Sequence, residues 1–353
     1  MSATKKHDIA VIAGDGIGKE VVPVGIDCVD AALARHDQSV TWTHLDWGSD
    51  YYLKNGTMMP ADGIATLAKH DAIFLGAVGL PGIPDTETLW GLLIPIRREF
   101  QQYVNLRPVR ALPGIDSPVR GGNDIDLMIV RENNEGEYSE IGGRIFRGLP
   151  QEAAIQENVF TRMGIERVTR FAAELAGQRR GHITSATKSN GIIHTMPFWD
   201  EVVAETLAEY DGVELEPILI DALAAKLILK PAAFDIIVAS NLFGDILSDL
   251  AGAIAGSIGV APSANLNPSG EFPSLFEPVH GSAPDIAGQG LANPIGQVWT
   301  GAMMLDHLGF PEASADLTSA FEAVVASGVR TRDLGGTAST SEVGAAIVAE
   351  LRK

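Results

Sequence analysis

Two aspartates, Asp245 and Asp249, lie four residues apart soon after the apolar run Asp235 to Ala239. Residues with this spacing share one face of a helix, so a helix that begins after the run would point both carboxylates the same way. If the run is a strand of an open α/β sheet, both carboxylates lie in the crevice at its carboxyl end, where such sheets bind ligands. Oxygen ligands held there suit Mg²⁺ or Mn²⁺. The alternative is a solvated aspartate pair on an ordinary amphipathic helix.

Three arginines could bind an anion. Arg97 and Arg107 flank one segment, and Arg131 follows the strand-like run Ile125 to Val130. Arginine forks bind carboxylates bidentately. Convergence of the three side chains would imply a substrate with more than one carboxylate. The alternative is that each arginine pairs separately with an aspartate or glutamate on the surface of this acidic protein.

A tyrosine, a lysine and a further aspartate are candidates for the remaining chemistry. Tyr138 could donate a proton to a carbanion or enolate, or be a half-buried surface aromatic. Lys188 could act as a general base if a nearby metal ion and arginines favoured loss of its proton, and is otherwise an exposed lysine. Asp221 closes the apolar run Leu215 to Ile220 and could join the other two aspartates on a metal.

Two glycine-containing loops bear on nucleotide binding. His280 to Gly288 suits a nucleotide, because glycines admit backbone close to phosphate and Asp285 could accept from ribose hydroxyls; a structural turn explains it almost as well. Gly14 to Glu20 does not match the dinucleotide fingerprint, because Lys19 stands where a glycine or alanine belongs and no clear acid ends the second strand. A tight strand-to-helix turn is predicted there instead.

The elements that must position these residues are short strands alternating with helices, which indicates an α/β architecture. Lys19 to Leu33 and Ile165 to Leu175 have helical apolar spacing. Candidate hinges lie at Tyr103 to Pro113 and Ala251 to Gly259, so the N- and C-terminal parts together would form one lobe. The predicted strands are His7 to Ala13, Val40 to Trp47, Ala72 to Ala77, Ile125 to Val130, His182 to Ala186, Leu215 to Ile220 and Phe234 to Ala239.

Composition limits the partners. The chain has 353 residues, 46% of them hydrophobic, and a net charge of -19 that would repel nucleic acid and anionic membranes. Met1 to Ala13 leaves no room for a signal peptide, and Leu250 to Leu266 is too rich in small residues and proline for a membrane span. With the single Cys28, these features predict a soluble, cytoplasmic protein.

Six ordered segments carry a resemblance to a known family: Gly14 to Gly18, Asn105 to Pro108, Arg131 to Asn133, Ser240 to Asp249, Glu277 to Asp285 and Asp333 to Gly336. Together they resemble the β-decarboxylating dehydrogenases, the family of isopropylmalate, isocitrate, homoisocitrate and tartrate/D-malate dehydrogenases. The resemblance covers nearly the whole chain, and chance agreement of so many ordered segments is negligible.

The resemblance implies an isocitrate/isopropylmalate dehydrogenase-like α/β fold, not a standard Rossmann fold. Two α/β domains would enclose a cleft that a second subunit completes, which makes the protein a homodimer with shared active sites. Residues 1–102 plus 256–353 would form the cofactor-side domain. Residues 103–255 would form the domain for substrate, metal and dimerisation.

The resemblance also implies roles for the metal and proton-transfer residues. Asp245 and Asp249 would hold Mg²⁺ or Mn²⁺, with Asp221 reaching in from the partner chain. The partner's Lys188 would deprotonate the C2 hydroxyl, and Tyr138 would protonate the enolate after CO₂ leaves. Oxidation comes first, because a β-keto acid loses CO₂ readily and the parent hydroxy acid does not. A requirement for K⁺ is left open.

On the same resemblance, NAD is the cofactor. An acid at Asp285 would bond the ribose hydroxyls and repel the 2′-phosphate of NADP. Asn293 would contact the adenine. The implied cofactor-binding residues are His280, Gly281, Ser282, Ala283, Asp285 and Asn293.

The substrate assignment comes from the segment before the first arginine. Three segments look like the tartrate/D-malate branch: Leu89 to Leu93, Glu132 to Glu140 and Ala186 to Gly191. The bulky indole of Trp90, in the first of these segments, would favour a compact C4 diacid. We therefore expect oxidative decarboxylation of D-malate to pyruvate and CO₂, with activity on tartrate. The alternatives are a 3-isopropylmalate dehydrogenase and a catalytically silent nucleotide-binding or regulatory subunit. The implied substrate-binding residues are Trp90, Leu93, Arg97, Arg107 and Arg131.

Overall fold

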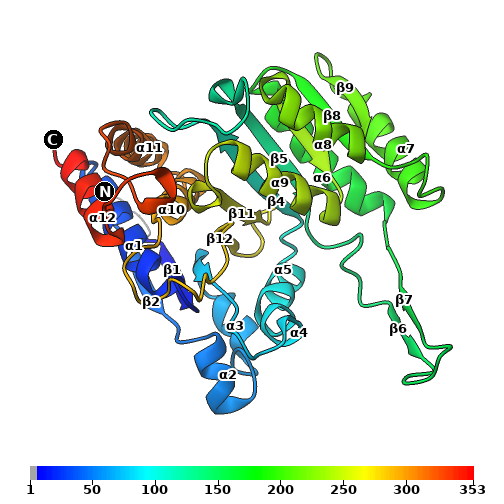
Figure 1. Cartoon of the computed structure of the whole chain (residues 1–353), viewed down its shortest axis with the longest axis horizontal. Helices are drawn as coiled ribbons and strands as arrows, with labels where there is room; N and C mark the ends of the chain where they lie inside the picture. The colour runs from blue at the N-terminus through cyan, green and yellow to red at the C-terminus, as the bar shows by residue number, and fades with distance from the viewer. Residues whose placement is uncertain (1–5) are drawn as a thin grey trace.

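One ten-stranded sheet runs through the computed structural model, which describes residues 6–353 (Figure 1). The strand order is β2-β1-β3-β12-β11-β4-β5-β10-β8-β9. Its strands are β1 (Asp8–Gly14), β2 (Thr41–His44), β3 (Ala72–Ala77), β4 (Val104–Arg110), β5 (Asp126–Glu132), β8 (His182–Thr187), β9 (Glu214–Leu219), β10 (Ile236–Ala239), β11 (Pro262–Leu266) and β12 (Ser274–Pro278). Residues 1–5, part of the segment expected to lack an export signal, lie outside the described residues.

The helices cover both faces of the sheet (Figure 1). A π-helical turn, Leu89–Leu93, joins α4 to α5, and short 3₁₀ turns occupy Gly122–Asp124, Pro231–Ala233, Ile258–Val260 and Arg332–Leu334. The helices are α1 (Gly18–Ala34), α2 (Ser49–Asn55), α3 (Gly63–Leu67), α4 (Asp85–Thr88), α5 (Ile94–Glu99), α6 (Arg162–Gly177), α7 (Thr195–Leu207), α8 (Ile220–Leu229), α9 (Asn241–Ile254), α10 (Ile295–His307), α11 (Pro311–Ala326) and α12 (Thr340–Leu351). In residues 6–353 no helix is both long and apolar enough to cross a bilayer.

Strand β1 shows how the first half of the sheet is buried on both faces. Ile9 and Val11 pack in the core that α1, α10, α11 and α12 share, whereas Ala10 and Ile12 face a second core under α2 to α5. Alternate side chains of a strand point to opposite faces, so a strand between two helical layers must be apolar throughout. This explains why the continuous run Ile9 to Ile12 predicted a strand.

The second half of the sheet is built the same way. Helices α6 and α7 pack against β5, β8 and β10, while α9 packs against β5 and β10 and also contacts α8. The predicted helix Ile165 to Leu175 lies within α6, with Ile165, Val168 and Ala172 buried. Each predicted strand is present, although Val40 to Trp47 is shortened to Thr41–His44 and Leu215 to Ile220 ends at Leu219.

The centre of the sheet differs from the prediction. Residues Tyr103 to Pro113, interpreted as a hinge, mostly form β4, which pairs antiparallel with both β5 and β11. Strands β11 and β12 and the arm of β6 (Gly142–Ile145) and β7 (Ala153–Gln156) were also missed. The chain does pass between the halves of the sheet at β4, but through a hydrogen-bonded strand. The division into 1–102 plus 256–353 and 103–255 stays a prediction.

The loop after β1 is a tight turn packed by protein. Gly14 and Gly16 have φ angles of 69° and 53°, and a Cβ at Gly16 would lie 1.9 Å from the carbonyl oxygen of Ser282. Buried Asp15 accepts hydrogen bonds from the backbone N–H groups of Ser49 and Gly79, each at 2.8 Å. The glycines therefore serve close packing against β3 and the His280 loop, as expected of a turn without the dinucleotide fingerprint.

Candidate active site

Helix α9 presents Asp245 and Asp249 on one face, at the carboxyl end of β10. The opposite face buries Phe243, Leu247 and Ala251, which fixes the rotation of the helix. The Asp245 side chain is 33% exposed and that of Asp249 58%. The two carboxylates thus face an accessible space above the sheet.

Arg107 on β4 and Arg131 on β5 are buried against these carboxylates. The Arg107 guanidinium lies 3.4 Å from an oxygen of each aspartate, and Arg131 contacts Asp245 and Asn241. Burial and the neighbouring Arg107 lower the pKa of Arg131 to about 10, so it stays charged at neutral pH. Burial alone would raise the pKa of Asp245, but Arg131 and Arg107 hold it below its usual range. Asp245 is therefore ionised.

Arg97, at the end of α5, completes an arginine group. Its Nη2 donates to Glu277 Oε1 at 2.8 Å, while the buried Nε atoms of Arg97 and Arg107 have no hydrogen-bond partner in residues 6–353. Arg97, Arg107 and Leu93 line a cavity of about 150 Å³ together with His280 and Gly281. Buried N–H groups without acceptors are costly, so this cavity fits an anionic ligand.

Tyr138 lies beside the same carboxylates. Its hydroxyl donates to Asp245 Oδ2 at 3.2 Å, and the Arg131 guanidinium carbon lies 5.6 Å from its ring centroid. Burial and the charge of Asp245 raise the pKa of Tyr138. The phenol therefore keeps its proton at neutral pH and is available as a donor.

Lys188 and Asp221 form a separate pair. Lys188, just after β8, places Nζ 2.8 Å from Asp221 Oδ1 in the first turn of α8, and the Asp221 side chain is 67% exposed. Within residues 6–353, no three His, Cys, Asp or Glu side chains are grouped so that they could hold a metal. Asp221 therefore does not join Asp245 and Asp249 within one chain, and its contribution from a partner stays a prediction.

The donor chemistry of α9 fits a divalent cation. Ionised Asp245 and the more exposed Asp249 offer hard oxygen ligands on one face, which suits Mg²⁺ or Mn²⁺ better than softer metals. Two carboxylates leave positions for other oxygen ligands. Substrate oxygens and a further carboxylate would complete such a site.

The His280 loop borders a larger cavity of about 610 Å³, lined by His280, Ala283 and Asn293 and also by Ile17 and Asp333. Burial lowers the pKa of His280, so its ring is neutral, and its buried Nε2 has no partner within the part of the chain described. An orphaned polar atom at the wall of a cavity this size fits a bound nucleotide. Because His280 also lines the small cavity, the two spaces adjoin.

Three of the proposed cofactor residues, Gly281, Ser282 and Asp285, do not line the larger cavity. Ser282 is buried, and its carbonyl accepts from the Ile17 N–H at 2.9 Å. Asp285 is exposed and is not among the residues that line the larger cavity. The Asn293 side chain donates to Asp333 Oδ2 at 2.9 Å and accepts from the Ile295 N–H. Asn293 therefore holds the wall of the cavity through Asp333.

Two acids were not proposed for the site, although both lie in segments that carry the resemblance. Glu277 anchors Arg97, and Asp333 lines the larger cavity. Their position within those segments was the signal in the sequence by which Glu277 and Asp333 could have been identified as site residues. Of the residues proposed for substrate contact, Leu93 lines the small cavity, whereas Trp90 is half-buried and packs against Arg98.

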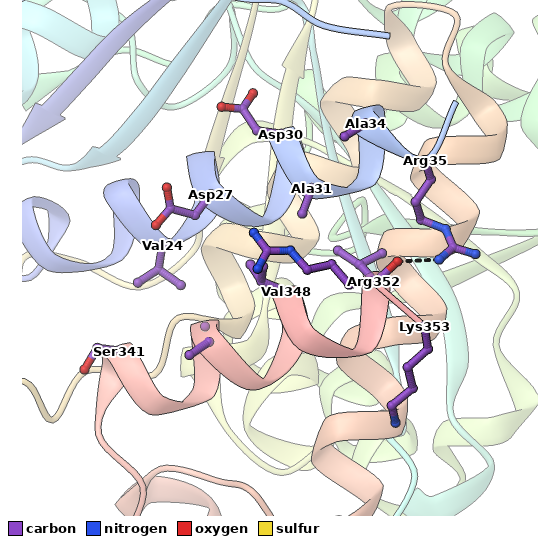
Figure 2. A pocket seen from close by; sticks show the side chains of 13 residues that line it. Val24, Asp27, Asp30, Ala31, Ala34, Arg35, Ser341, Val348, Arg352 and Lys353 are labelled. Carbon is purple, nitrogen blue, oxygen red and sulfur yellow. Dashed lines mark hydrogen bonds between the residues drawn. The ribbon is translucent and has the colours of Figure 1, made fainter. Parts of the chain in front are cut away.

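A cavity of about 870 Å³ between α1 and α12 contains none of these residues (Figure 2). Its wall combines aliphatic side chains with Asp27, Asp30, Arg352 and Lys353, and Arg35 donates to the carbonyl of Leu351 at its edge. Size alone therefore does not locate the chemistry in this molecule.

The fold and site define a class of enzyme. The family model for isocitrate/isopropylmalate dehydrogenase matches residues 8–347. The chain belongs to this family. Its α/β fold is that of the family: the crystal structure of isocitrate dehydrogenase from Methylococcus capsulatus matches with a TM-score of 0.89 and 33% identity, covering 98% of this chain and 100% of that one.

Relatives narrow the class further. The chain is 57% identical over 351 residues to a probable tartrate dehydrogenase/decarboxylase of Bacillus subtilis, covering 99% of each protein. It is 52% identical to the decarboxylating D-malate dehydrogenase of Escherichia coli, covering 97% of this chain and 98% of the relative. A tartrate dehydrogenase/decarboxylase of Pseudomonas putida is also 52% identical, with 96% of each covered. The chain is therefore an enzyme of the decarboxylating dehydrogenase type.

Proposed function

We propose that this enzyme oxidises D-malate with NAD and Mg²⁺ or Mn²⁺, yielding pyruvate and CO₂, and that it also oxidises tartrate. The observation that carries the proposal is the small cavity, where Arg97 and Arg107 meet His280 and Gly281. Buried arginines suit a dicarboxylate, and the adjoining larger cavity would bring a nucleotide beside it. The names of the relatives support the same substrates.

The chain's own side chains would perform the following steps. Arg97, Arg107 and Arg131 would bind the carboxylates, and Lys188 of a second subunit would take the hydroxyl proton as hydride leaves C2 for NAD⁺. The resulting β-keto acid loses CO₂, and Tyr138 would give its proton to the enolate carbon. When bound, the divalent ion supplies a positive charge that polarises the hydroxyl and keto oxygens.

The preference for NAD over NADP rests on the resemblance, because Asp285 does not line the larger cavity. This carboxylate lies on the loop that begins at His280, where it would repel a 2′-phosphate.

The single Cys28 is free and buried, in keeping with the proposed cytoplasmic location.

Exposed apolar side chains support the proposed homodimer. The arm of β6 and β7 extends away from the sheet (Figure 1) and exposes Ile141, Ile145 and Ile155 by at least half. Leu229 on α8 and Ile246 on α9 are 73% and 52% exposed. Large apolar residues gathered on protruding elements mark interaction surfaces. A second copy covering α8 and α9 would also lie beside Asp245.

A substrate panel tests the proposal. With Mn²⁺ and NAD⁺, we expect kcat/KM for D-malate and L-tartrate to exceed that for 3-isopropylmalate by at least about tenfold, because a small cavity with Leu93 in its wall leaves little room for a branched alkyl group. NADP⁺ in place of NAD⁺ is the cofactor control. A preference for 3-isopropylmalate would overturn the substrate assignment. If no hydroxy diacid yields NADH although Mn²⁺ binds, the chain is the catalytically silent relative.

Tyr138→Phe tests the proton donor. We expect steady-state CO₂ release from D-malate to fall about 100-fold, because the hydroxyl beside Asp245 is lost, while the first-turnover rate of NADH formation changes far less. Stopped-flow absorbance and CO₂ assays separate the two. Tyr52→Phe on α2 is the matched control. Unchanged CO₂ release would remove Tyr138 from the mechanism.

A further inference from the structure

Arg98 follows the buried Arg97 on α5 and contacts two other parts of the chain. Its guanidinium carbon lies 5.1 Å from the ring centroid of Trp90, in the π-helical turn before α5. Its Nη2 donates to the backbone carbonyl of Tyr138 at 2.9 Å, and its Nη1 lies 3.0 Å from Glu140. One side chain therefore connects the turn that carries Trp90 to the loop that carries Tyr138.

These contacts differ in strength. The Glu140 side chain is 68% exposed, so solvent screens its ion pair with Arg98 and little stabilisation follows. The bond to the Tyr138 carbonyl is charge-assisted and is made by a side chain only 29% exposed. Packing on the Trp90 ring restricts the guanidinium and so favours this bond. The hydrogen bond to the Tyr138 carbonyl is therefore the contact that holds the loop in place.

The loop around Tyr138 is anchored on both sides, but within residues 6–353 the backbone of Tyr138 itself is hydrogen-bonded by Arg98 alone. Next to it, the Glu137 carboxylate accepts from Ser240 Oγ and the Leu242 N–H, and Gln156 Nε2 donates to the carbonyls of Glu137 and Ser139. Before it, Glu132 accepts from the N–H groups of Asn134 and Glu135, and Gly136 pairs with Val159. After it, Ser139 Oγ donates to the carbonyl of Glu157. Between these anchors, Arg98 holds the backbone of the residue whose hydroxyl reaches Asp245.

We propose that Arg98 is a positioning residue that sets where the Tyr138 hydroxyl meets the substrate, and that Trp90 acts through Arg98. The proposal deepens the proposed function and rests on it. The turn Leu89–Leu93 carries both Trp90 and Leu93, which lines the small cavity. The wall of the substrate cavity and the proton donor are thus connected through one guanidinium.

Arg98→Met and Arg98→Lys test this role with D-malate, NAD⁺ and Mn²⁺. Arg98→Met should lower steady-state CO₂ release about tenfold, while the KM for D-malate and the first-turnover rate of NADH formation stay within about twofold. Arg98→Lys should recover part of the loss, because an ammonium can still donate to the carbonyl. Arg170→Met is the matched control, since Arg170 on α6 pairs with Glu209, just after α7 and outside the site. It should match the unmodified enzyme.

The same substitution in a Tyr138→Phe background separates two failures. If Arg98 acts through Tyr138, Arg98→Met should add nothing to the slow CO₂ release of Tyr138→Phe. A loss in Tyr138→Phe but none in Arg98→Met and Arg98→Lys would overturn the role of Arg98 alone. A raised KM with unchanged CO₂ release would instead make Arg98 a substrate contact. Normal CO₂ release in Tyr138→Phe would overturn the proposed function, and this inference with it.

Discussion

Asp245→Asn is expected to lower kcat/KM for D-malate about 10³-fold and to weaken Mn²⁺ binding in parallel. Asp245 contacts three of the other proposed participants of its own chain: its oxygens contact Arg131 and Arg107 and accept from the Tyr138 hydroxyl. The two arginines hold its pKa below the usual range, so the lost group is a carboxylate at neutral pH. Steady-state kinetics and titration calorimetry with Mn²⁺ give the two readouts.

Asp249→Asn provides a graded comparison. Asp249 is more exposed and contacts Arg107 at 3.4 Å, so its loss should weaken Mn²⁺ binding but disturb the arginines less. Asp62→Asn, at an exposed position before α3, is the matched control and should behave like the unmodified enzyme. Thermal unfolding of each variant shows whether Arg131 still packs. Full Mn²⁺ affinity in both Asp245→Asn and Asp249→Asn would place the metal elsewhere.

Strands that lie between two helical layers were predictable because both of their faces are apolar. Strand β10 is buried throughout, and its run of Ile and Val residues stands out in the sequence. Strands β4 and β11 were missed because they carry buried polar residues. Asn105 donates to Ser263 at 2.7 Å and Asn265 donates to Glu277 at 2.7 Å, so these amides find partners across strands that no periodicity in a single sequence reveals.

The same distinction applies to the candidate site: positions set by local spacing were predictable, and contacts between separate loops were not. Asp245 and Asp249 share a helix face by spacing alone, and Arg131 lies near the end of β5, which the strand pattern located. Arg107 lies within β4, which that pattern missed. Contacts between separate loops were not predictable. The packing of Trp90 on Arg98 depends on a π-helical turn, and the exposure of Asp285 depends on how its loop folds over Ile17. Both follow from tertiary packing that local sequence does not encode.

Mixing inactive Lys188→Ala and Asp245→Ala chains is expected to restore about a quarter of wild-type activity. If each site takes Lys188 from one chain and Asp245 from the other, random exchange makes half of the dimers mixed, and each mixed dimer has one intact site of two. The structure motivates this test because Lys188 pairs with Asp221 and not with the group around Asp245. NADH formation from D-malate is followed after the two chains are exchanged in mild denaturant.

Two further mixtures decide what any recovery means. Lys188→Ala mixed with Asp221→Ala should stay inactive, because both residues would come from the same chain and every mixed dimer would carry one lesion in each site. Wild-type chains mixed with the Lys188→Ala, Asp245→Ala double variant should lose activity in proportion to dimer exchange, because each mixed dimer would then carry a lesion in both of its sites. If the Lys188→Ala and Asp245→Ala mixture recovers no activity and the wild-type mixture loses none, while native mass spectrometry shows that mixed dimers have formed, each chain builds its site alone. Lys188 and Asp221 would then need a different role, and the exposed faces of α8 and α9 would have to serve assembly without serving catalysis.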